Sequence, residues 1–410
     1  MKKLLYIVTG LVFFMVSCQS DGLYDYSEVR NSEAIGMEGA ESRTISAKAL
    51  DFVSDLRKET RAGTEGLSVS SVYAWRVCDM LPQTRYGLSM LPTDTLLYIV
   101  NFTNDNGFAL VSALDNYDGV VAYIESGHLT PDDEIDNPGF NFFLESFMAG
   151  GGFSPGIPDP TPYDSIPIPG VWHTTAFYAP LLTTQWGQGD PFNRLCYTSD
   201  SLQAVAGCGA IAASQIVAYH QHPSAYQTHT YLWNDILSGN TPQTESGKTS
   251  VSELVYDVGH LIRTEYGVSA STSYTDSISY CWNEFGYSYS LMDFNIDSCL
   301  VDFQNNRPVF MRGTGIIEFP DRIRVFGHAW VIDGCVVRER EILTIQPPGS
   351  QNEIQHFIHC NWGWDGEYDG YYIAGAFGTK YDQNGENPTT AYPFYNLLLR
   401  TYNNIYPLNP

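Results

Sequence analysis

The sequence contains 410 residues, of which 16% are charged and 14% are aromatic, and its formal net charge is −25. So acidic a chain argues against nucleic acids and anionic membrane surfaces as partners, because both require basic patches on the protein. A length of 410 residues exceeds one ordinary hydrophobic core and predicts two domains.

The N-terminus has the pattern of an export signal. A lysine pair precedes an apolar run, Leu4 to Val16, which ends at Ser17 and Cys18. The run is too short for a permanent membrane helix, and its flanks predict a signal peptide over residues 1–17. A cysteine directly after a small residue predicts a lipoprotein signal, with Cys18 acylated and residues 18–40 as a polar tether. The alternative is an ordinary signal peptide cut nearby, with Cys18 incidental.

Residues 41–149 are predicted to form a small α+β domain. Ser46 resembles the N-cap of an amphipathic helix whose apolar side carries Leu50, Val53 and Leu56. Two β-rich apolar runs, Leu97 to Phe102 and Gly107 to Val111, are separated by polar turn residues and predict a hairpin. This domain shows no evident catalytic constellation.

A boundary follows at residues 150–170, which contain six prolines and five glycines. Such a composition excludes a helix or a central strand. The segment is therefore predicted to be an exposed, extended linker with a processing site, and residues 171–403 are predicted to form the second domain.

The eight cysteines are irregularly spaced, with no CxxC pair and no Cys/His cluster at zinc-ligand spacing. Neither a structural metal site nor a small disulfide scaffold is indicated. Apart from Cys18, seven cysteines remain, and an odd number leaves at least one thiol without a disulfide partner in the chain. We interpret most of the seven as buried, reduced core residues.

The run of small and apolar residues from Gly209 to His220 predicts a buried helix that ends before Pro223. Cys208 falls at its N-terminus, where unpaired N–H groups and the helix dipole stabilise a thiolate. This placement suits a nucleophile. Taken alone, the segment favours a small cysteine packed among alanines, so the nucleophile hypothesis depends on partners elsewhere.

Two later strands supply such partners. The alternating run Val325 to Gly334 predicts a buried strand that contains His328, and a second strand ends at Asn361 and Trp362 before the strand Gly370 to Ala374. If the first two strands are antiparallel neighbours, Asn361 reaches the His328 ring and Trp362 shields that contact from water. Cysteine, histidine and asparagine in this order are typical of a nucleophile, its general base and an orienting amide. His328 alone favours a satisfied core histidine.

Four segments in this order resemble the streptopain family of papain-like cysteine peptidases: AGCGAIAASQIVAYHQHP, VSELVYDVGHLIRTEYG, GHAWVIDGC and NWGWDGEYDGYY. The upstream segment NGFALVSALDNYDGVVAYIESG is similar to the propeptide of that family. The resemblance implies an α+β fold, in which a small α+β propeptide domain precedes a papain-like catalytic domain. The helical part of that catalytic domain carries the nucleophile, and its antiparallel sheet carries the histidine and asparagine.

Residue by residue, the resemblance implies Cys208 as nucleophile, His328 as base, and Asn361 and Trp362 as the orienting turn. Gly327 and the serine-rich stretch around Ser271 are similar to places where the family lines its substrate cleft.

The oxyanion hole is expected to combine the Cys208 N–H with an upstream glutamine amide. Gln188 fits the glutamine of papain-like enzymes best, Gln203 is closer in sequence and Gln185 is a third candidate.

The resemblance implies a cysteine endopeptidase that cleaves protein or peptide substrates through a thioester and needs no metal or organic cofactor. Its own propeptide is the expected intramolecular inhibitor. Lipid on Cys18 is expected to hold the precursor at the outer membrane or cell surface until cleavage within residues 150–170 releases the catalytic domain outside the cell. Two alternatives remain open: a catalytically silent binding or inhibitor lipoprotein, and a papain-like transglutaminase or amidase.

Overall fold

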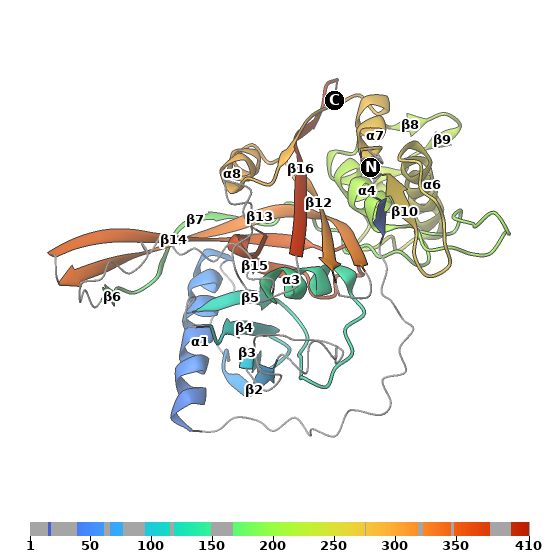
Figure 1. The fold of residues 1–410 in the computed structure, drawn as a ribbon. Helices are drawn as coiled ribbons and strands as arrows, with labels where there is room; N and C mark the ends of the chain where they lie inside the picture. Colours follow the sequence, from blue (N-terminus) through green and yellow to red (C-terminus); the bar gives the residue numbers. More distant parts are fainter. Residues whose placement is uncertain are drawn as a thin grey trace, which may run out of the picture.

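The computed structural model describes residues 15–17, 39–60, 66–76, 95–114, 119–148, 167–274, 276–318, 323–345, 348–377 and 395–409. Within these residues one sheet of 12 strands runs through both halves of the chain (Figure 1). Its order is β11-β16-β12-β13-β14-β15-β5-β4-β3-β2, with β6 and β7 paired to β13. The mixture of helices with an antiparallel sheet confirms the predicted α+β class.

The strands of this sheet have the following bounds: β2 Val69–Arg76, β3 Thr95–Phe102, β4 Phe108–Ser112, β5 Val120–Ile124, β6 Pro167–Pro169, β7 His173–Tyr178, β11 Tyr287–Asp293, β12 Val309–Glu318, β13 Ile323–Ile345, β14 Pro348–Asn361, β15 Gly370–Ile373 and β16 Tyr395–Pro407.

The N-terminal domain contains β2 to β5 and two helices, α1 (Ala40–Thr60) and α3 (Pro138–Met148). Its strands β3 and β4 pair antiparallel, which confirms the predicted hairpin. The expectation that a helix begins after Ser46 is wrong, because α1 already begins at Ala40. Ile45 and Ala49 are buried and extend the apolar stripe by a turn towards the N-terminus.

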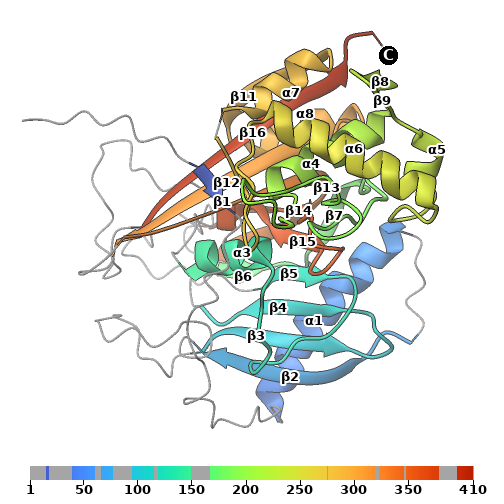
Figure 2. The same ribbon diagram turned by 90° about the vertical axis from the view of Figure 1, so that its right-hand side faces the viewer.

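The C-terminal domain supplies the other helices, which are α4 Cys208–His220, α5 Trp233–Ile236, α6 Glu245–Leu261, α7 Ile278–Glu284, α8 Ile296–Gln304 and the 3₁₀ turn η2 Ala374–Phe377. Three of its short strands lie outside the large sheet: β8 Ala225–Tyr226, β9 His229–Thr230 and β10 Thr272–Tyr274. In Figure 2, helices α4, α6 and α7 and strands β2 to β4 lie at opposite ends of the molecule, with α3 between them.

The two faces of β13 belong to two different hydrophobic cores. Ala329 and Val331 are buried together with the residues of α4. Trp330 and Ile332 are buried together with α3 and the N-terminal domain. Since successive side chains of a strand point to opposite faces, β13 separates α4 from α3.

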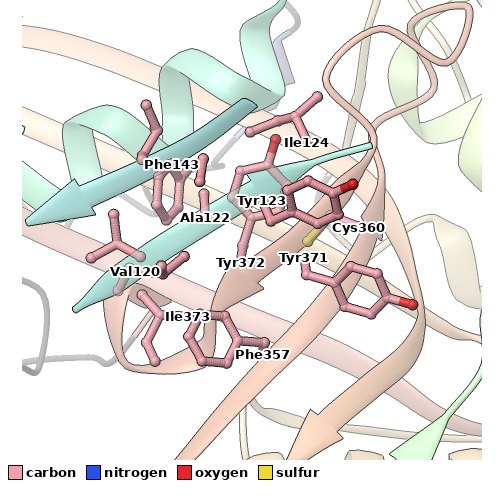
Figure 3. Packing of buried hydrophobic residues seen from close by; sticks show 14 of the residues in the cluster. Val120, Ala122, Tyr123, Ile124, Phe143, Phe357, Cys360, Tyr371, Tyr372 and Ile373 are labelled. Atoms are coloured by element: carbon pink, nitrogen blue, oxygen red, sulfur yellow. The ribbon is translucent and has the colours of Figure 1, made fainter. Parts of the chain in front are cut away.

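The two domains join where β5 pairs antiparallel with β15. A Cβ atom on Gly370 would overlap the carbonyl oxygen of Tyr123, so glycine permits the close approach of the two strands. Figure 3 shows side chains of β5 packed beside those of β14 and β15, among them Val120, Ala122, Tyr123, Phe357, Tyr371, Tyr372 and Ile373. The N-terminal domain thus extends the sheet of the C-terminal domain and shares its core.

The N-terminal run contributes β1 (Met15–Ser17), which pairs antiparallel with β10 and falls within the predicted export signal. In the part of the chain that the structure describes, no helix has both the length and the apolar character needed to span a membrane.

Candidate active site

Cys208 is the first residue of α4, as the sequence predicts, and only 2% of its surface is exposed. The N-cap is Gly207, whose φ of +91° is strained for any residue with a side chain, and no side chain caps the helix. Cys208 therefore lies at the uncapped helix end, beside its free backbone N–H groups and the positive end of the helix dipole.

The Cys208 sulfur is disulfide-bonded in this structure. Nucleophilic attack requires the thiolate, so this is an oxidised form that a reductant has to open first. The other described cysteines, which are Cys196, Cys281, Cys299, Cys335 and Cys360, are buried free thiols, as the sequence predicts for core cysteines.

Gln188 lies beside the nucleophile. Its backbone carbonyl accepts a hydrogen bond from the N–H of Ala206, at 3.0 Å, two residues before Cys208. The side chain is only 4% exposed, yet neither its Nε2 nor its Oε1 has a hydrogen-bond partner within the described residues. A buried amide without a partner costs free energy, so this geometry favours an amide that hydrogen-bonds to an oxygen atom of a bound ligand.

The two other glutamine candidates are engaged in structural contacts. Gln203 is exposed and donates to the backbone carbonyls of Asn193 and Cys196. The Oε1 of Gln185 accepts from the Asn240 amide at 2.8 Å. The geometry therefore supports Gln188 among the three.

His328 is fully buried on the α3 face of β13. Its ring centroid lies 6.0 Å from that of Trp330 and 6.1 Å from that of Trp362. Desolvation lowers the pKa of His328 to about 4, against the opposing effect of a hydrogen bond to the Trp362 carbonyl. His328 is thus neutral near pH 7 and lies on the face of the strand opposite to α4. The structure does not bring the predicted base together with the predicted nucleophile.

The predicted contact between Asn361 and His328 is wrong for this structure. The strands are antiparallel neighbours as expected, but Asn361 pairs with Val331 and so shares its α4 face. Its Oδ1 accepts from Gln215 Nε2 at 2.9 Å and from the N–H of Gly363 at 3.2 Å. His328 Nε2 bonds instead to the backbone carbonyl of Trp362, at 2.8 Å.

The turn after Asn361 is held by a residue that the sequence analysis missed. Asp369 Oδ1 accepts from the backbone N–H of Trp362 at 2.8 Å, and burial raises the pKa of Asp369 to about 7. The Trp362 indole N–H donates to the Tyr368 carbonyl and to the Tyr372 hydroxyl. The acidic residue directly before the buried strand Gly370–Ile373 was the available signal.

Helix α3 of the N-terminal domain packs against the His328 side of the site. From the sequence, this domain is expected to be an inhibitor, but none of its contacts was predicted. A Cβ atom on Gly139 would overlap the Trp362 ring and lie 2.9 Å from Cδ2 of His328. Asn137 caps the helix by accepting from the N–H groups of Gly139 and Phe140, and its Nδ2 donates to the Glu367 carbonyl. The start of α3 is therefore wedged between His328 and the turn that follows Trp362.

The two predicted cleft residues differ in role. Ser271 is buried, and its hydroxyl donates to the Val205 carbonyl at 2.6 Å and accepts from the Gly267 N–H at 3.1 Å. It holds the segment before Cys208 in place, and its place in a substrate cleft stays a prediction. Gly327 is buried and pairs with Thr314 in the β12–β13 ladder.

The predicted lipidation residue, Cys18, lies outside the described residues, as does most of the predicted linker.

The structure contains three parts of an acyl-transfer site. One is an uncapped helix end that carries a cysteine, and the second is a buried amide without a partner in the described residues. The third is a neutral histidine on the strand beneath that helix. In the described residues no group of three or more His, Cys, Asp or Glu side chains is placed to hold a metal ion. The arrangement is incomplete because His328 faces α3.

Comparisons with known proteins assign each half of the chain to a family. The model of the Peptidase C10 family matches residues 186–372, and that of the Spi protease inhibitor matches residues 48–149. Streptopain from Streptococcus pyogenes serotype M28 (strain MGAS6180) is 28% identical over 235 residues, which cover 46% of this chain and 52% of streptopain. The chain thus spans about half the length of the streptopain sequences it matches.

Two further similarities cover more of the chain. The thiol protease/hemagglutinin PrtT of Porphyromonas gingivalis is 24% identical over 347 residues, 71% of this chain and 36% of that protein. A solved structure of a fragment of prointerpain A from Prevotella intermedia matches with a TM-score of 0.52 at 20% identity. That match covers 83% of this chain and 99% of the fragment, and at this identity it supports the fold alone.

Proposed function

We propose that this chain, which belongs to the streptopain (Peptidase C10) family and carries a Spi-type inhibitor domain, is a cysteine endopeptidase made as a latent precursor. In this proposal Cys208 is the nucleophile, Gln188 completes the oxyanion hole and His328 is the general base. The substrates are proteins or peptides.

The observation that carries the proposal is the N-terminus of α4. It is led by Cys208, lacks a side-chain cap, and is joined through Ala206 to Gln188, whose buried amide has no partner within the described residues. Such a helix end stabilises a thiolate, and the amide adds a donor where negative charge develops on a substrate oxygen.

The chemistry follows from these groups. The Cys208 thiol gives its proton to His328, and the thiolate attacks the carbonyl carbon of the peptide bond. The Cys208 N–H and the Gln188 amide donate to the oxyanion, and the His328 imidazolium protonates the leaving amine. His328 then takes a proton from water, the hydroxide attacks the thioester, and the carboxylic acid and the free thiol are released.

Latency is supported by the position of α3. For the reaction above, His328 has to leave the α3 face of β13, where Gly139, Trp330 and Trp362 surround it. This burial is incompatible with a histidine that exchanges protons with Cys208.

Two further contacts hold the N-terminal domain, and with it α3, against the C-terminal domain. One is the β5–β15 pairing. The other is an ion pair between Arg338 of β13 and the carboxylates of Asp51 and Asp55 on α1, at 3.2 and 3.5 Å. In this proposal, activation therefore requires removal of the N-terminal domain.

Export and lipid anchoring are part of the proposal and rest on the sequence pattern at residues 1–18. Acylation of Cys18 would hold the precursor at the outer membrane or cell surface, and cleavage within residues 150–170 would free the catalytic domain. A fatty-acid analogue fed to expressing cells should label the chain but not its Cys18→Ser variant. N-terminal sequencing of the active form should start within residues 150–170; an active form that begins at Cys18 would refute release.

The function is tested by cleaving the chain within residues 150–170 to activate it and incubating it with casein under reducing conditions, beside its Cys208→Ala variant treated in the same way. We expect new backbone fragments and labelling by a thiol-reactive active-site probe for the wild type, and neither for the variant. Ammonia release without fragments would indicate an amidase or transglutaminase. Equal labelling of the two proteins without turnover would indicate a silent binding protein.

A further inference from the structure

Gln215 of α4 is a fully buried amide whose donor and acceptor groups are both used. Its Oε1 accepts from the Thr184 hydroxyl at 2.8 Å and from the Trp186 N–H at 3.5 Å. Its Nε2 donates to Asn361 Oδ1 at 2.9 Å. The side chain is 0% exposed, so no solvent takes the place of these partners.

The partners of Gln215 are bonded to one another as well. Asn361 Nδ2 donates to the Thr184 carbonyl at 2.7 Å, which closes a ring of hydrogen bonds through Gln215, Thr184 and Asn361. The loop that contains Thr184 and the turn that follows Asn361 are joined by a further hydrogen bond, in which the Asp365 N–H donates to the Trp186 carbonyl at 3.3 Å. A closed, buried polar network of this kind is rigid, because any rotation leaves a buried group without a partner.

The network joins three segments that carry the proposed reaction. Gln215 lies seven residues after Cys208, about two helical turns, so both residues lie on the same side of α4. Thr184 belongs to the loop that continues to Gln188. Asn361 begins the turn whose next residue offers its carbonyl to Nε2 of His328.

We propose that Gln215 is a positioning residue of the peptidase reaction. It touches no reacting atom, but it sets the distance and orientation between the nucleophile helix, the oxyanion loop and the turn that contacts His328. The inference rests on the proposed function and adds to it a residue that acts through Thr184 and Asn361.

The amide is the group that this role requires. Glutamate at position 215 keeps the shape but loses the donor to Asn361 Oδ1 and places a charge in a buried site. Methionine keeps the volume but leaves both Thr184 and Asn361 without their partner. Ser214, the adjacent residue, is also 0% exposed, and its hydroxyl has no partner within the described residues, so Ser214→Ala is a matched control.

The test uses the full-length chain after activation, with rates normalised to the amount of Cys208 that an active-site probe titrates. For Gln215→Glu and Gln215→Met we expect kcat to fall about tenfold or more while KM changes less than about twofold, because transition-state alignment is lost and not substrate affinity. The pH profile of kcat/KM should shift as well. Ser214→Ala should behave as the wild type.

A milder pair of variants, at Thr184, keeps the test informative if the Gln215 variants misfold. Thr184→Val removes the hydroxyl that bonds Gln215, and Thr184→Ser retains it, so the first should lower kcat and the second should restore it. If all these variants only lower the thermal midpoint and keep the kcat and pH profile of the wild type, Gln215 is merely structural and the proposal is wrong. If the wild type itself cleaves no peptide, the proposed function fails instead.

Discussion

The Nε2–H of His328 donates to the backbone carbonyl of Trp362 at 2.8 Å, on the face of β13 that is covered by α3. Since a carbonyl oxygen only accepts, this contact selects the tautomer that carries hydrogen at Nε2. The role that the sequence predicted for the Asn361 side chain is filled here by the main chain of the next residue.

Acid should destabilise the latent packing around His328. Its folded pKa of about 4 lies below the ordinary 6.5, so between these values the unfolded chain binds more protons. Stability therefore falls as the pH is lowered through this window, by roughly 1.4 kcal/mol for each pH unit. Urea unfolding of the full chain in a Cys208→Ala background should show a smaller pH slope for His328→Gln. His220→Leu, which removes a half-buried histidine of similarly low pKa, tests whether the effect is confined to His328.

Gly139→Ala should weaken latency. The added methyl group overlaps the Trp362 ring, so either α3 or the ring has to move, at a cost of about 1–3 kcal/mol. We expect faster conversion of the precursor, followed on gels and by probe labelling. Ser146→Ala changes another buried residue of α3 without adding an atom and should convert at the wild-type rate. If the Gly139→Ala precursor converts at the wild-type rate, the packing of α3 against Trp362 and His328 does not maintain latency.

Gln188→Ala should lower kcat by about 10²–10³, the usual loss for one oxyanion donor, with little change in thermal stability because its amide has no partner to lose among the described residues. Steady-state kinetics of the activated chain measure this. Gln203→Ala should leave kcat close to the wild-type value, and the reverse ranking of the two variants would assign the oxyanion hole to Gln203.

Asp55→Asn should loosen the contact between the two domains. Asp55 accepts from the Thr174 hydroxyl at 2.7 Å and lies 3.5 Å from the buried guanidinium of Arg338. Loss of this charge should cost about 1–3 kcal/mol and speed activation. Glu59→Gln removes the same charge from an exposed position of α1 and is the control. Equal activation rates in the two variants would show that Arg338 does not help to hold the domain.

The sequence alone determined the features that depend on local chemistry. The small residues that follow Cys208 predicted the helix and its N-terminus, and alternating apolar residues predicted the strands of His328 and Asn361, which are antiparallel neighbours. The segments around these residues were enough to indicate the family, because the order of nucleophile, base and amide along the chain can be read directly from the sequence.

Only the tertiary structure decided which face each side chain occupies. Asn361 and His328 lie on neighbouring strands but point to opposite faces of the sheet. The register pairs Asn361 with Val331, and the side chain of Val331 points to the face opposite to that of His328. The wedge at Gly139, the Asp369 contact and the Gln215 network depend on side-chain packing, and the first and last of them join segments far apart in the chain. Contacts of this kind follow from packing between elements, which no local pattern encodes.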